Sequence, residues 1–278
     1  MTSYLITGGS GFLGRGLARK LLRDDTGRIC IYSRGEYQQA LARSALEDPQ
    51  GKLRWMIGDV RDLSRLRWAM RGVDVVIHAA ALKRIEVGAY APSEMVNTNV
   101  VGTMNVIDAA AYCGVKKVVY VSSDKAWRPI SPYGQTKATA ECLILSGNTE
   151  RLGPMFSACR YGNVAGSTGS VIPMWRDILK RSKSVPVTDP DATRFWMTRE
   201  EAVNLVLFLA DEMQGGELRV PSLPAYRLGD LAEAMGAEMD IIGMPPHEKM
   251  HEGMEEGNTS DMAPRLTVSD LKERLRHV

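Results

Sequence analysis

The sequence predicts an α/β protein in which a doubly wound parallel sheet is joined to a smaller C-terminal lobe. Two patterns support this fold class. Up to about residue 160, short apolar runs of strand length alternate with amphipathic stretches at helical spacing, as is typical of a parallel sheet covered by helices on both faces. After residue 160, glycine- and proline-rich loops separate further helix candidates. We therefore expect one domain over residues 1–160 and a smaller lobe over residues 161–278, from which some segments return to the first domain.

The elements are placed by apolar spacing and by residues that end helices. Apolar residues recur at helical spacing between Phe12 and Leu22, which gives the first helix one apolar face. The helix that ends near Cys113 is followed by Gly114, a residue suited to a left-handed cap. The expected strands are 4–7, 29–33, 53–57, 75–78, 118–121 and 156–160, and the expected helices after residue 160 are 171–181, 199–213, 228–237 and 268–277.

The bulk composition excludes several classes of protein. Of the 278 residues, 44% are hydrophobic and 24% are charged, and 35 basic and 33 acidic side chains leave a net charge of only +2. Such a mixture lacks the broad basic field of a nucleic-acid binder. The four cysteines are widely spaced, and no apolar run approaches the ~18 residues of a membrane span. We expect a soluble, cytoplasmic protein with reduced thiols, no membrane segment and no secretion signal.

A glycine-rich segment, TGGSGFLG, places Gly8, Gly11 and Gly14 between the first strand and the first helix. Glycine at these positions permits a tight turn, lets the backbone approach a pyrophosphate and brings the helix close to the strand. The backbone N–H groups at the helix start, including those of Phe12 and Leu13, are donors for phosphate oxygens. This context predicts a Rossmann-type dinucleotide-binding domain, with a purely structural glycine turn as the alternative.

The end of the second strand bears on the choice of cofactor. An NAD site usually has an acidic residue there, which accepts hydrogen bonds from the ribose hydroxyls. This strand ends instead in Ser33-Arg34. A hydroxyl and a guanidinium suit the 2′-phosphate of NADP, which an aspartate would repel. We therefore predict NADP as the cofactor, with an ordinary surface arginine as the alternative.

Two further strand ends supply candidate cofactor contacts. Asp59 follows the third strand and is placed to accept a hydrogen bond from the adenine amino group, although a loop-capping aspartate explains it nearly as well. His78 ends the fourth strand and is followed by Ala79, Ala80 and Ala81, small residues that let the chain run close beneath a cofactor. His78 itself fits a packed core histidine better than a functional one.

A tyrosine and a lysine in the segment SPYGQTK form a candidate proton-transfer pair. Ser131 is a suitable N-cap and Pro132 a suitable first helical residue, so Tyr133 and Lys137 would share a helix face one turn apart. A lysine ammonium near the phenol stabilises phenolate and lowers the tyrosine pKa toward the range where it can act as a base. With Ser123 upstream and a dinucleotide domain before it, this pair predicts nicotinamide chemistry.

At this point the sequence resembles the extended short-chain dehydrogenase/reductase superfamily, and within it the polysaccharide-biosynthesis branch of inverting UDP-N-acetylglucosamine 4,6-dehydratases. The resemblance runs over nearly the whole chain, and several of its segments are long and particular to that branch. They are TGGSGFLG, YSRGE, GDVRDLSRL, HAAALKRIEVGAYAPSEMVNTNVVGT, SSDKAWRPISPYGQTK, RYGNVAGSTGSVIP, TRFWMT and GMPPHEKMHE.

The resemblance implies a redox-neutral lyase that acts on a UDP-sugar. Hydride passes from C4 of the sugar to NADP⁺, water is eliminated across C5 and C6, and the hydride returns to C6. By this resemblance, Tyr133 takes the C4 hydroxyl proton with support from Lys137, and Ser123 holds that hydroxyl. Lys125 then matches the base at C5, and Asp124 matches the acid at the departing C6 hydroxyl.

The chemistry of elimination favours the same assignment for Asp124-Lys125. A proton must be taken at one carbon and another delivered to the oxygen on its neighbour, which suits two different groups held close together. Lysine can act as a base only if its pKa is depressed by burial or by neighbouring positive charge, including that of the oxidised nicotinamide. We therefore expect a depressed pKa for Lys125. A structural Asp-Lys pair at a strand end is the alternative.

The resemblance extends to the remaining ligand contacts and to assembly. It implies a homo-oligomer, with a dimer through the helices around residues 95–112 and 133–146 as the minimum. A surface lysine explains Lys83 nearly as well as a ligand contact does, and packing explains the aromatic residues beside Arg194 equally well. The implied cofactor contacts are Val60, Lys83 and Asn99, and the implied substrate contacts are Lys83, Asn163, Ser170, Val171, Arg194 and Glu248.

A metal-site pattern occurs in PPHEKMHE, where His247, Glu248 and His251 satisfy the HExxH motif of a zinc hydrolase. The same residues align with the substrate-loop segment of the dehydratases, so we expect no metal. That segment departs from the family pattern, because Pro245-Pro246-His247 replace an arginine and a Pro-Gly pair. One contact to the substrate diphosphate is therefore missing or comes from elsewhere in the chain.

Two other functions compete with dehydration. A nucleotide-sugar 4-epimerase needs Tyr133 and Lys137 but has no use for Asp124 and Lys125. A non-catalytic NADP-binding regulator would have no reason to keep the proton-transfer groups. Both alternatives are consequently less favoured than the 4,6-dehydratase.

Overall fold

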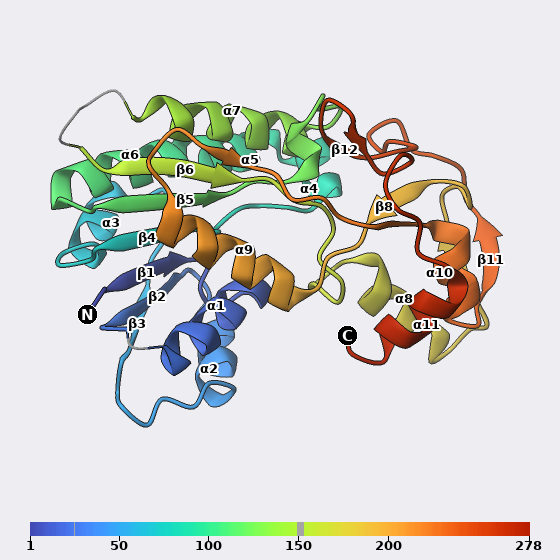
Figure 1. Ribbon diagram of the computed structural model, residues 1–278, viewed down its shortest axis with the longest axis horizontal. Coiled ribbons are helices and arrows are strands. Elements are labelled where there is room, and N and C mark those ends of the chain that lie inside the picture. The colour runs from blue at the N-terminus through green and yellow to red at the C-terminus, as the bar shows by residue number, and fades with distance from the viewer. Residues whose placement is uncertain (25, 149–152) are drawn as a thin grey trace.

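A seven-stranded parallel sheet forms the centre of the protein, in a computed structural model that describes residues 1–24, 26–148 and 153–278. Its strand order, β3-β2-β1-β4-β5-β6-β9 (Figure 1), is that of a doubly wound dinucleotide-binding sheet. The predicted fold class is confirmed, and the six predicted strands form with ends shifted by at most one residue. The strands are β1 Tyr4–Thr7, β2 Ile29–Ser33, β3 Leu53–Ile57, β4 Val75–His78, β5 Lys117–Val121, β6 Met155–Cys159 and β9 Leu218–Arg219.

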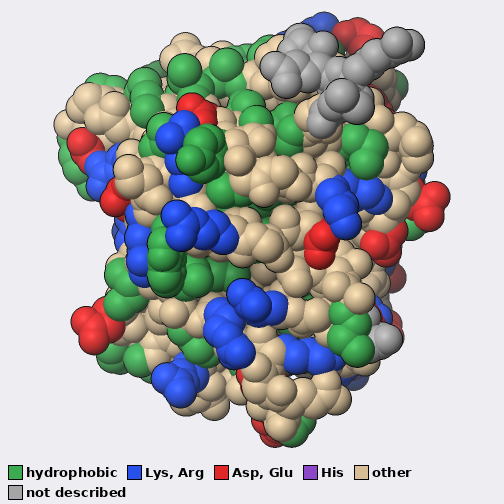
Figure 2. Space-filling view, turned by 90° about the vertical axis from the view of Figure 1, so that its left-hand side faces the viewer, with side chains coloured by type: hydrophobic (Ala, Val, Ile, Leu, Met, Phe, Trp, Pro, Cys, Tyr) green, Lys and Arg blue, Asp and Glu red, His purple; other side chains and the backbone are tan. Residues whose placement is uncertain are grey.

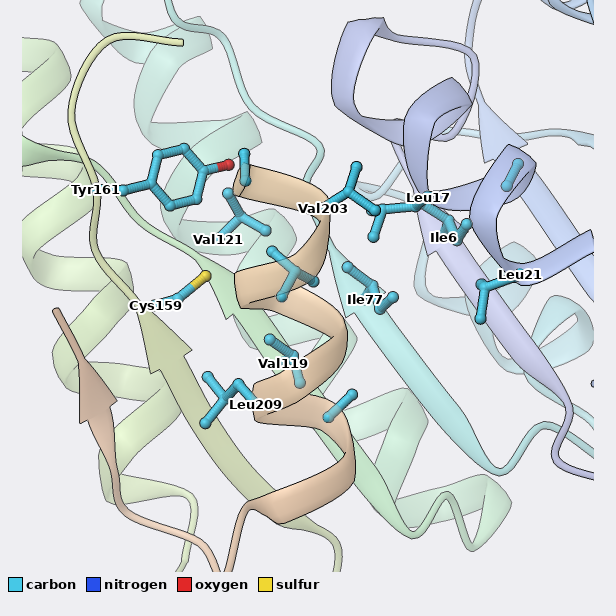
Figure 3. Close-up of a cluster of buried hydrophobic side chains, with 14 of the residues drawn as sticks. Ile6, Leu17, Leu21, Ile77, Val119, Val121, Cys159, Tyr161, Val203 and Leu209 are labelled. Atoms are coloured by element: carbon cyan, nitrogen blue, oxygen red, sulfur yellow. The ribbon is translucent and has the colours of Figure 1, made fainter. Parts of the chain in front are cut away.

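Helices cover both faces of this sheet because the central strands bury both of their faces. Ile6 of β1 packs in the apolar cluster under α1 (Phe12–Arg23) and α9 (Arg199–Glu212), whereas Leu5 packs in the cluster under α3 (Leu63–Ala69), α6 (Gly102–Cys113) and α7 (Pro132–Ser146). Successive side chains of a strand point to opposite faces, so a covered parallel strand is apolar throughout. Figure 3 shows Leu209 of α9 close to Val119 of β5 and Val203 of α9 close to Leu17 of α1, and α2 (Glu36–Ser44) lies on the α1 side (Figure 1).

Two predicted helix ends are confirmed. Gly114 follows α6 with φ 68° and ψ 32°, the left-handed conformation that ends a helix without a Cβ clash. Ser131 caps α7 by accepting a hydrogen bond from the Gly134 N–H at 3.2 Å, and Pro132 is the first helical residue. Because these contacts determine where α7 begins, they also position Tyr133 beside the end of β5.

The smaller lobe has its own apolar core next to the carboxyl ends of the strands (Figure 1). Trp175, Trp196 and Tyr226 are buried there between α8 (Val171–Leu179), α10 (Leu228–Ala234) and α11 (Val268–Leu275). These helices and α9 end one to three residues before their predicted ends; after α10, for example, Gly236 turns the chain with φ 70°. The lobe's two-stranded sheets pair β7 Ser184–Val187 with β11 Glu238–Ile241, β8 Thr193–Phe195 with β10 Ala225–Arg227, and β12 Gly253–Glu255 with β13 Asn258–Thr259.

Short helical segments lie around the junction between sheet and lobe. They are α4 (Ile85–Tyr90), α5 (Pro92–Val96), a π-helical turn (Asn97–Val101) and, directly after β5, a 3₁₀ turn (Asp124–Ala126). At the opposite end of the sheet, near the amino ends of the strands, Lys and Arg side chains are scattered among hydrophobic ones (Figure 2). Among the helices in the described ranges, none is both long and apolar enough to cross a membrane.

Candidate active site

A cavity of about 680 Å³ opens where the carboxyl ends of the strands meet the lobe. This is the edge at which open α/β sheets bind their ligands. The cavity brings together most of the residues predicted from sequence. Those on its wall are Gly8, Gly11, Phe12, Leu13, Gly14, Ser33, Arg34, Val60, Ala79, Ala80, Ala81, Lys83, Ser123, Asp124, Lys125, Tyr133, Lys137, Asn163 and Ser170, whereas Asp59, Asn99, Val171, Arg194 and Glu248 do not line it.

The glycine loop is closely packed and fits a dinucleotide. A Cβ at Gly14 would lie 2.5 Å from both the Cα and the O of Gly9, and one at Gly8, where φ is +67°, would lie 3.0 Å from Ala80 Cα. The turn therefore holds α1 so close to the sheet that no side chain fits at Gly8 or Gly14. Gly11 is the N-cap residue of α1 and makes no side-chain capping hydrogen bond. The N–H groups at the start of the helix are therefore available at the cavity wall for a pyrophosphate.

The end of β2 places Arg34 at the cavity wall with 47% of its side chain exposed. Ser33 Oγ accepts a hydrogen bond from Gln39 Nε2 at 3.0 Å and keeps its own proton to donate. Asp59 does not face the cavity, because its carboxylate accepts from the N–H and the Nε of Arg61 at 2.9 and 3.0 Å. The structure therefore gives Asp59 the loop-capping role, and the predicted adenine contact has no geometric support.

His78 is a core histidine, as the sequence indicated. It is fully buried between Thr7 Oγ1 at 2.7 Å and Thr103 Oγ1 at 3.0 Å. Burial, with a smaller effect from Lys137, lowers its pKa to about 3, so the ring is neutral at physiological pH.

Asn99 acts on the loop after β4 and not on the cavity itself. Its side chain accepts from the Leu82 N–H at 2.8 Å, donates to Leu82 O at 2.9 Å and donates to Thr136 Oγ1 at 3.0 Å. These bonds tie the loop to α7 and so position Lys83, whose pKa is lowered by burial and by Arg84. Arg84 and the two residues that follow it also line the cavity; sequence reasoning missed them, although they stand next to Lys83.

Tyr133 and Lys137 both reach the cavity from α7, but their electrostatics differ from the prediction. Burial raises the pKa of Tyr133 to about 12, against the smaller effect of hydrogen bonding with Ser123. Burial lowers the pKa of Lys137 to about 7, and its Nζ donates to Val121 O at 2.6 Å and lies 4.1 Å from the centre of the Tyr120 ring. The expected lowering of the tyrosine pKa by Lys137 is therefore wrong for this structure.

Asp124, Lys125 and Glu252 form a buried cluster at the same wall. Lys125 Nζ lies 3.0 Å from Asp124 Oδ2 and 3.0 Å from Glu252 Oε1. Burial alone would lower the pKa of Lys125, but the two carboxylates outweigh it and raise that pKa above its ordinary value. The predicted depression of the Lys125 pKa is thus wrong, because Glu252, which contributes to this shift, was not foreseen. Burial also raises the pKa of Asp124, and Glu252 adds to this effect.

The loop after β6 supplies two polar atoms without partners. Asn163 Oδ1 and Ser170 Oγ are buried and make no hydrogen bond to any described residue, and both residues line the cavity. Buried polar atoms are usually paired, so these two are available to a ligand. Val171 begins α8 directly after Ser170.

Arg194 and Glu248 bind each other, and they lie away from the cavity. Arg194 Nη2 donates to the Glu248 carboxylate, and its Nη1 donates to Thr193 O at 2.7 Å. Residues 247–251 form an irregular segment of a turn and bends that ends in a β-bridge at His251, where the zinc motif requires a helix. His251 Nδ1 lies 2.8 Å from Thr193 Oγ1, and the zinc-hydrolase alternative loses its geometric basis.

Residues 4–268 match the model of a family described as polysaccharide biosynthesis protein. The chain belongs to this family. A relative in Campylobacter jejuni, UDP-N-acetylglucosamine 4,6-dehydratase (inverting), is 42% identical over 258 residues, which cover 91% of this chain and 77% of the relative. UDP-glucose 4-epimerase of Rickettsia canadensis is 38% identical over 280 residues, covering 96% and 81%. The solved structure of Pen from Bacillus thuringiensis superposes with a TM-score of 0.94 at 32% identity, covering 100% of this chain and 98% of that one.

Proposed function

We propose that the protein is an NADP-dependent nucleotide-sugar 4,6-dehydratase, a hydro-lyase whose substrate is UDP-N-acetylglucosamine. The observation that supports dehydration best is the buried Asp124–Lys125 pair, with Nζ 3.0 Å from Oδ2, on the cavity wall beside Tyr133. The similarity to the Campylobacter jejuni dehydratase supports the substrate.

Oxidation at C4 begins with removal of the C4 hydroxyl proton. Tyr133 takes this proton, and Ser123 holds the hydroxyl by a hydrogen bond. The glycine loop and Arg34 would hold NADP, which would supply a hydride acceptor at C4 and a hydride donor at C6. Hydrogen bonding with Ser123 favours the phenolate, which helps to offset the effect of burial on Tyr133.

Elimination of water follows, because the 4-keto group acidifies the C5 proton. Lys125 takes this proton and Asp124 delivers one to the C6 hydroxyl, which leaves as water. In the resting pair, Lys125 is an ammonium and Asp124 a carboxylate. Transfer of one proton across the 3.0 Å between Nζ and Oδ2 turns them into an amine and an acid without any exchange with solvent. The raised pKa of Asp124 favours this transfer, and the raised pKa of Lys125 opposes it. Reprotonation of C5 on the other face gives inversion.

Substrate binding involves both halves of the molecule. We assign the cofactor to residues 1–160 and the UDP-sugar mainly to residues 161–278, with α9 and β9 returning to the sheet. Lys83, Asn163, Ser170 and the start of α8 at Val171 contact the sugar nucleotide. Arg194 and Glu248 act indirectly, since they bind each other behind the cavity wall.

Assembly as a homo-oligomer, with a dimer as the minimum, is part of the proposal. Exposed apolar side chains follow one another along α5, the π-helical turn and α6, at Val96, Val101, Met104 and Tyr112. Such a row is unusual for a monomer surface, and it coincides with the helices that the sequence resemblance implies at a dimer interface. Sedimentation of the purified protein tests this assignment, and a monomer at micromolar concentration would contradict it.

Mass spectrometry separates the proposed function from its rivals. Incubation with UDP-N-acetylglucosamine and NADP⁺ should yield a product lighter by the mass of one water. An unchanged mass with altered stereochemistry at C4 would indicate an epimerase, which the Rickettsia canadensis relative makes the second candidate. Binding of NADP without binding of any nucleotide-sugar would indicate a regulator.

A further inference from the structure

Glu252 has no task in the mechanism described above, although it lies at the centre of the acid–base cluster. Only 1% of its side chain is exposed, and Oε1 lies 3.0 Å from Lys125 Nζ. Its other oxygen, Oε2, is buried without a hydrogen-bond partner among the described residues. A buried carboxylate is costly unless its charge is compensated, so its presence at this position needs a physical reason.

The lobe holds Glu252 rigidly against the end of β5. Its backbone N–H donates to Ser260 Oγ at 2.8 Å, and the Ser260 N–H donates back to Glu252 O at 2.7 Å. Ser260 Oγ in turn lies 2.6 Å from Thr193 Oγ1 of β8. The backbone at Glu252 is therefore fixed by two strands of the lobe, and the carboxylate it carries reaches the 3₁₀ turn of the sheet domain.

We propose that Glu252 is the positioning residue of the Asp124–Lys125 pair, holding Lys125 Nζ in place and keeping within the pair the proton that Asp124 delivers to the leaving hydroxyl. The catalytic part of this inference rests on the proposed dehydratase function. The positioning part concerns only this chain and can be measured without substrate.

The proton balance explains why a third charge is useful. At rest the cluster contains one ammonium and two carboxylates. Proton transfer from Lys125 to Asp124 leaves an amine, an acid and the Glu252 carboxylate, with the same total number of protons. The amine can donate one N–H to Glu252 Oε1, which leaves its lone pair free for the C5 proton. When the C5–H and C6–O bonds break and a C5–C6 double bond forms, Lys125 gains the C5 proton. Asp124 gives its proton to the departing C6 hydroxyl, which leaves as water, so the resting charges return.

Other charged groups face the cluster and set its balance. Arg194 of β8 opposes the effect of the carboxylates on Lys125, and Lys249, with Nζ donating to Trp127 O at 2.5 Å, acts on Glu252. Tyr133 approaches from α7, and its pKa responds to both Asp124 and Lys125. Glu252 raises the pKa of Lys125 and that of Asp124, so its removal should lower both and release the proton at a lower pH.

The test variant is Glu252→Gln, which keeps the shape and one acceptor but removes the charge. Dehydration should become about 100-fold slower, within the usual range for acid–base groups, and its pH optimum should move about one unit lower by the loss of the charge. Oxidation at C4, followed as a transient at 340 nm, should change less than about threefold because Glu252 does not contact Tyr133. Glu252→Asp should recover part of the rate. The matched control is Glu256→Gln, since Glu256 is 82% exposed and pairs with Arg128 at the surface; it should behave as wild type.

A second measurement needs no substrate. The Lys125 pKa is read by NMR of ¹³C-lysine-labelled protein with NADP bound, assigned with Lys125→Arg, and it should be lower in Glu252→Gln. NADP affinity and the melting temperature confirm folding, and Glu252→Ala, which also removes the charge, replaces Glu252→Gln in the titration if the latter does not fold. An unchanged Lys125 pKa, or an unchanged dehydration rate and pH profile, overturns the inference. A lowered pKa in a protein that dehydrates no nucleotide-sugar supports the positioning role and rejects the proposed function alone.

Discussion

Lys137→Met should make the protein more stable at neutral pH. Lys137 is 3% exposed and has a pKa of about 7 in place of its ordinary 10.5. The folded state therefore binds fewer protons than the unfolded chain between these two values, and the stability of the wild type rises with pH across that window. Methionine is similar in length, apolar and unaffected by pH.

The magnitude follows from the two pKa values. At pH 7 the depressed pKa makes the folded state about 4 kcal/mol less stable than an ordinary lysine would, and at pH 9.5 about 1 kcal/mol less. The substitution also removes the 2.6 Å hydrogen bond to Val121 O and the contact with the Tyr120 ring, which together contribute about 2 kcal/mol. Lys137→Met should consequently be about 2 kcal/mol more stable at pH 7 and no more stable than wild type at pH 9.5.

Urea unfolding followed by tryptophan fluorescence at pH 7, 8.5 and 9.5 measures this difference. The control is Lys180→Met, because Lys180 is 71% exposed and its substitution should give no pH-dependent change. A stability difference between Lys137→Met and wild type that stays constant from pH 7 to 9.5 would refute the reasoning, since it would mean that Lys137 does not titrate in this range.

Three further predictions follow from the geometry of the site. Lys125→Ala should slow dehydration by about 10²–10⁴-fold while cofactor reduction persists; normal release of water would remove Lys125 from the mechanism. Arg34→Ala should weaken NADP binding by about 10- to 100-fold and leave NAD binding unchanged, and equal effects on the two cofactors in calorimetry would exclude a contact with the 2′-phosphate. Glu141→Leu should destabilise the protein by about 3–5 kcal/mol in urea unfolding, because it leaves Arg160 buried without its carboxylate. The double variant Arg160→Met with Glu141→Leu should recover most of this loss. A double variant as unstable as Glu141→Leu would show that the pair is not the cause.

The features that could be predicted from sequence are those decided by local patterns. The parallel strands carry apolar residues at successive positions, the glycine loop combines a strand, a turn and a helix within one short segment, and Ser131-Pro132 determines the start of α7. Tyr133 and Lys137 were therefore placed correctly relative to each other and to the cavity.

The features that could not be predicted depend on contacts between distant segments. Glu252 comes from the lobe and meets Lys125 only through the packing around β8 and β12, so the sign of the Lys125 pKa shift could not be read from the neighbouring Asp124. The resemblance implied a substrate contact for Arg194, yet Glu248 and two backbone carbonyls engage it. Asp59 was assigned to adenine because its partner, Arg61, could not be distinguished from a solvated side chain.

Product mass after reaction in ²H₂O tests the central claim most directly, namely that this chain removes water across C5 and C6 with Lys125 as the base at C5. Purified protein is incubated with UDP-N-acetylglucosamine and NADP⁺ in ²H₂O, and exchangeable deuterium is washed out before mass analysis. The wild type should give a product that has lost one water and gained one deuterium, located at C5 by NMR, and Lys125→Ala should not. A product of unchanged mass, or one that has lost water without deuterium at C5, would contradict it.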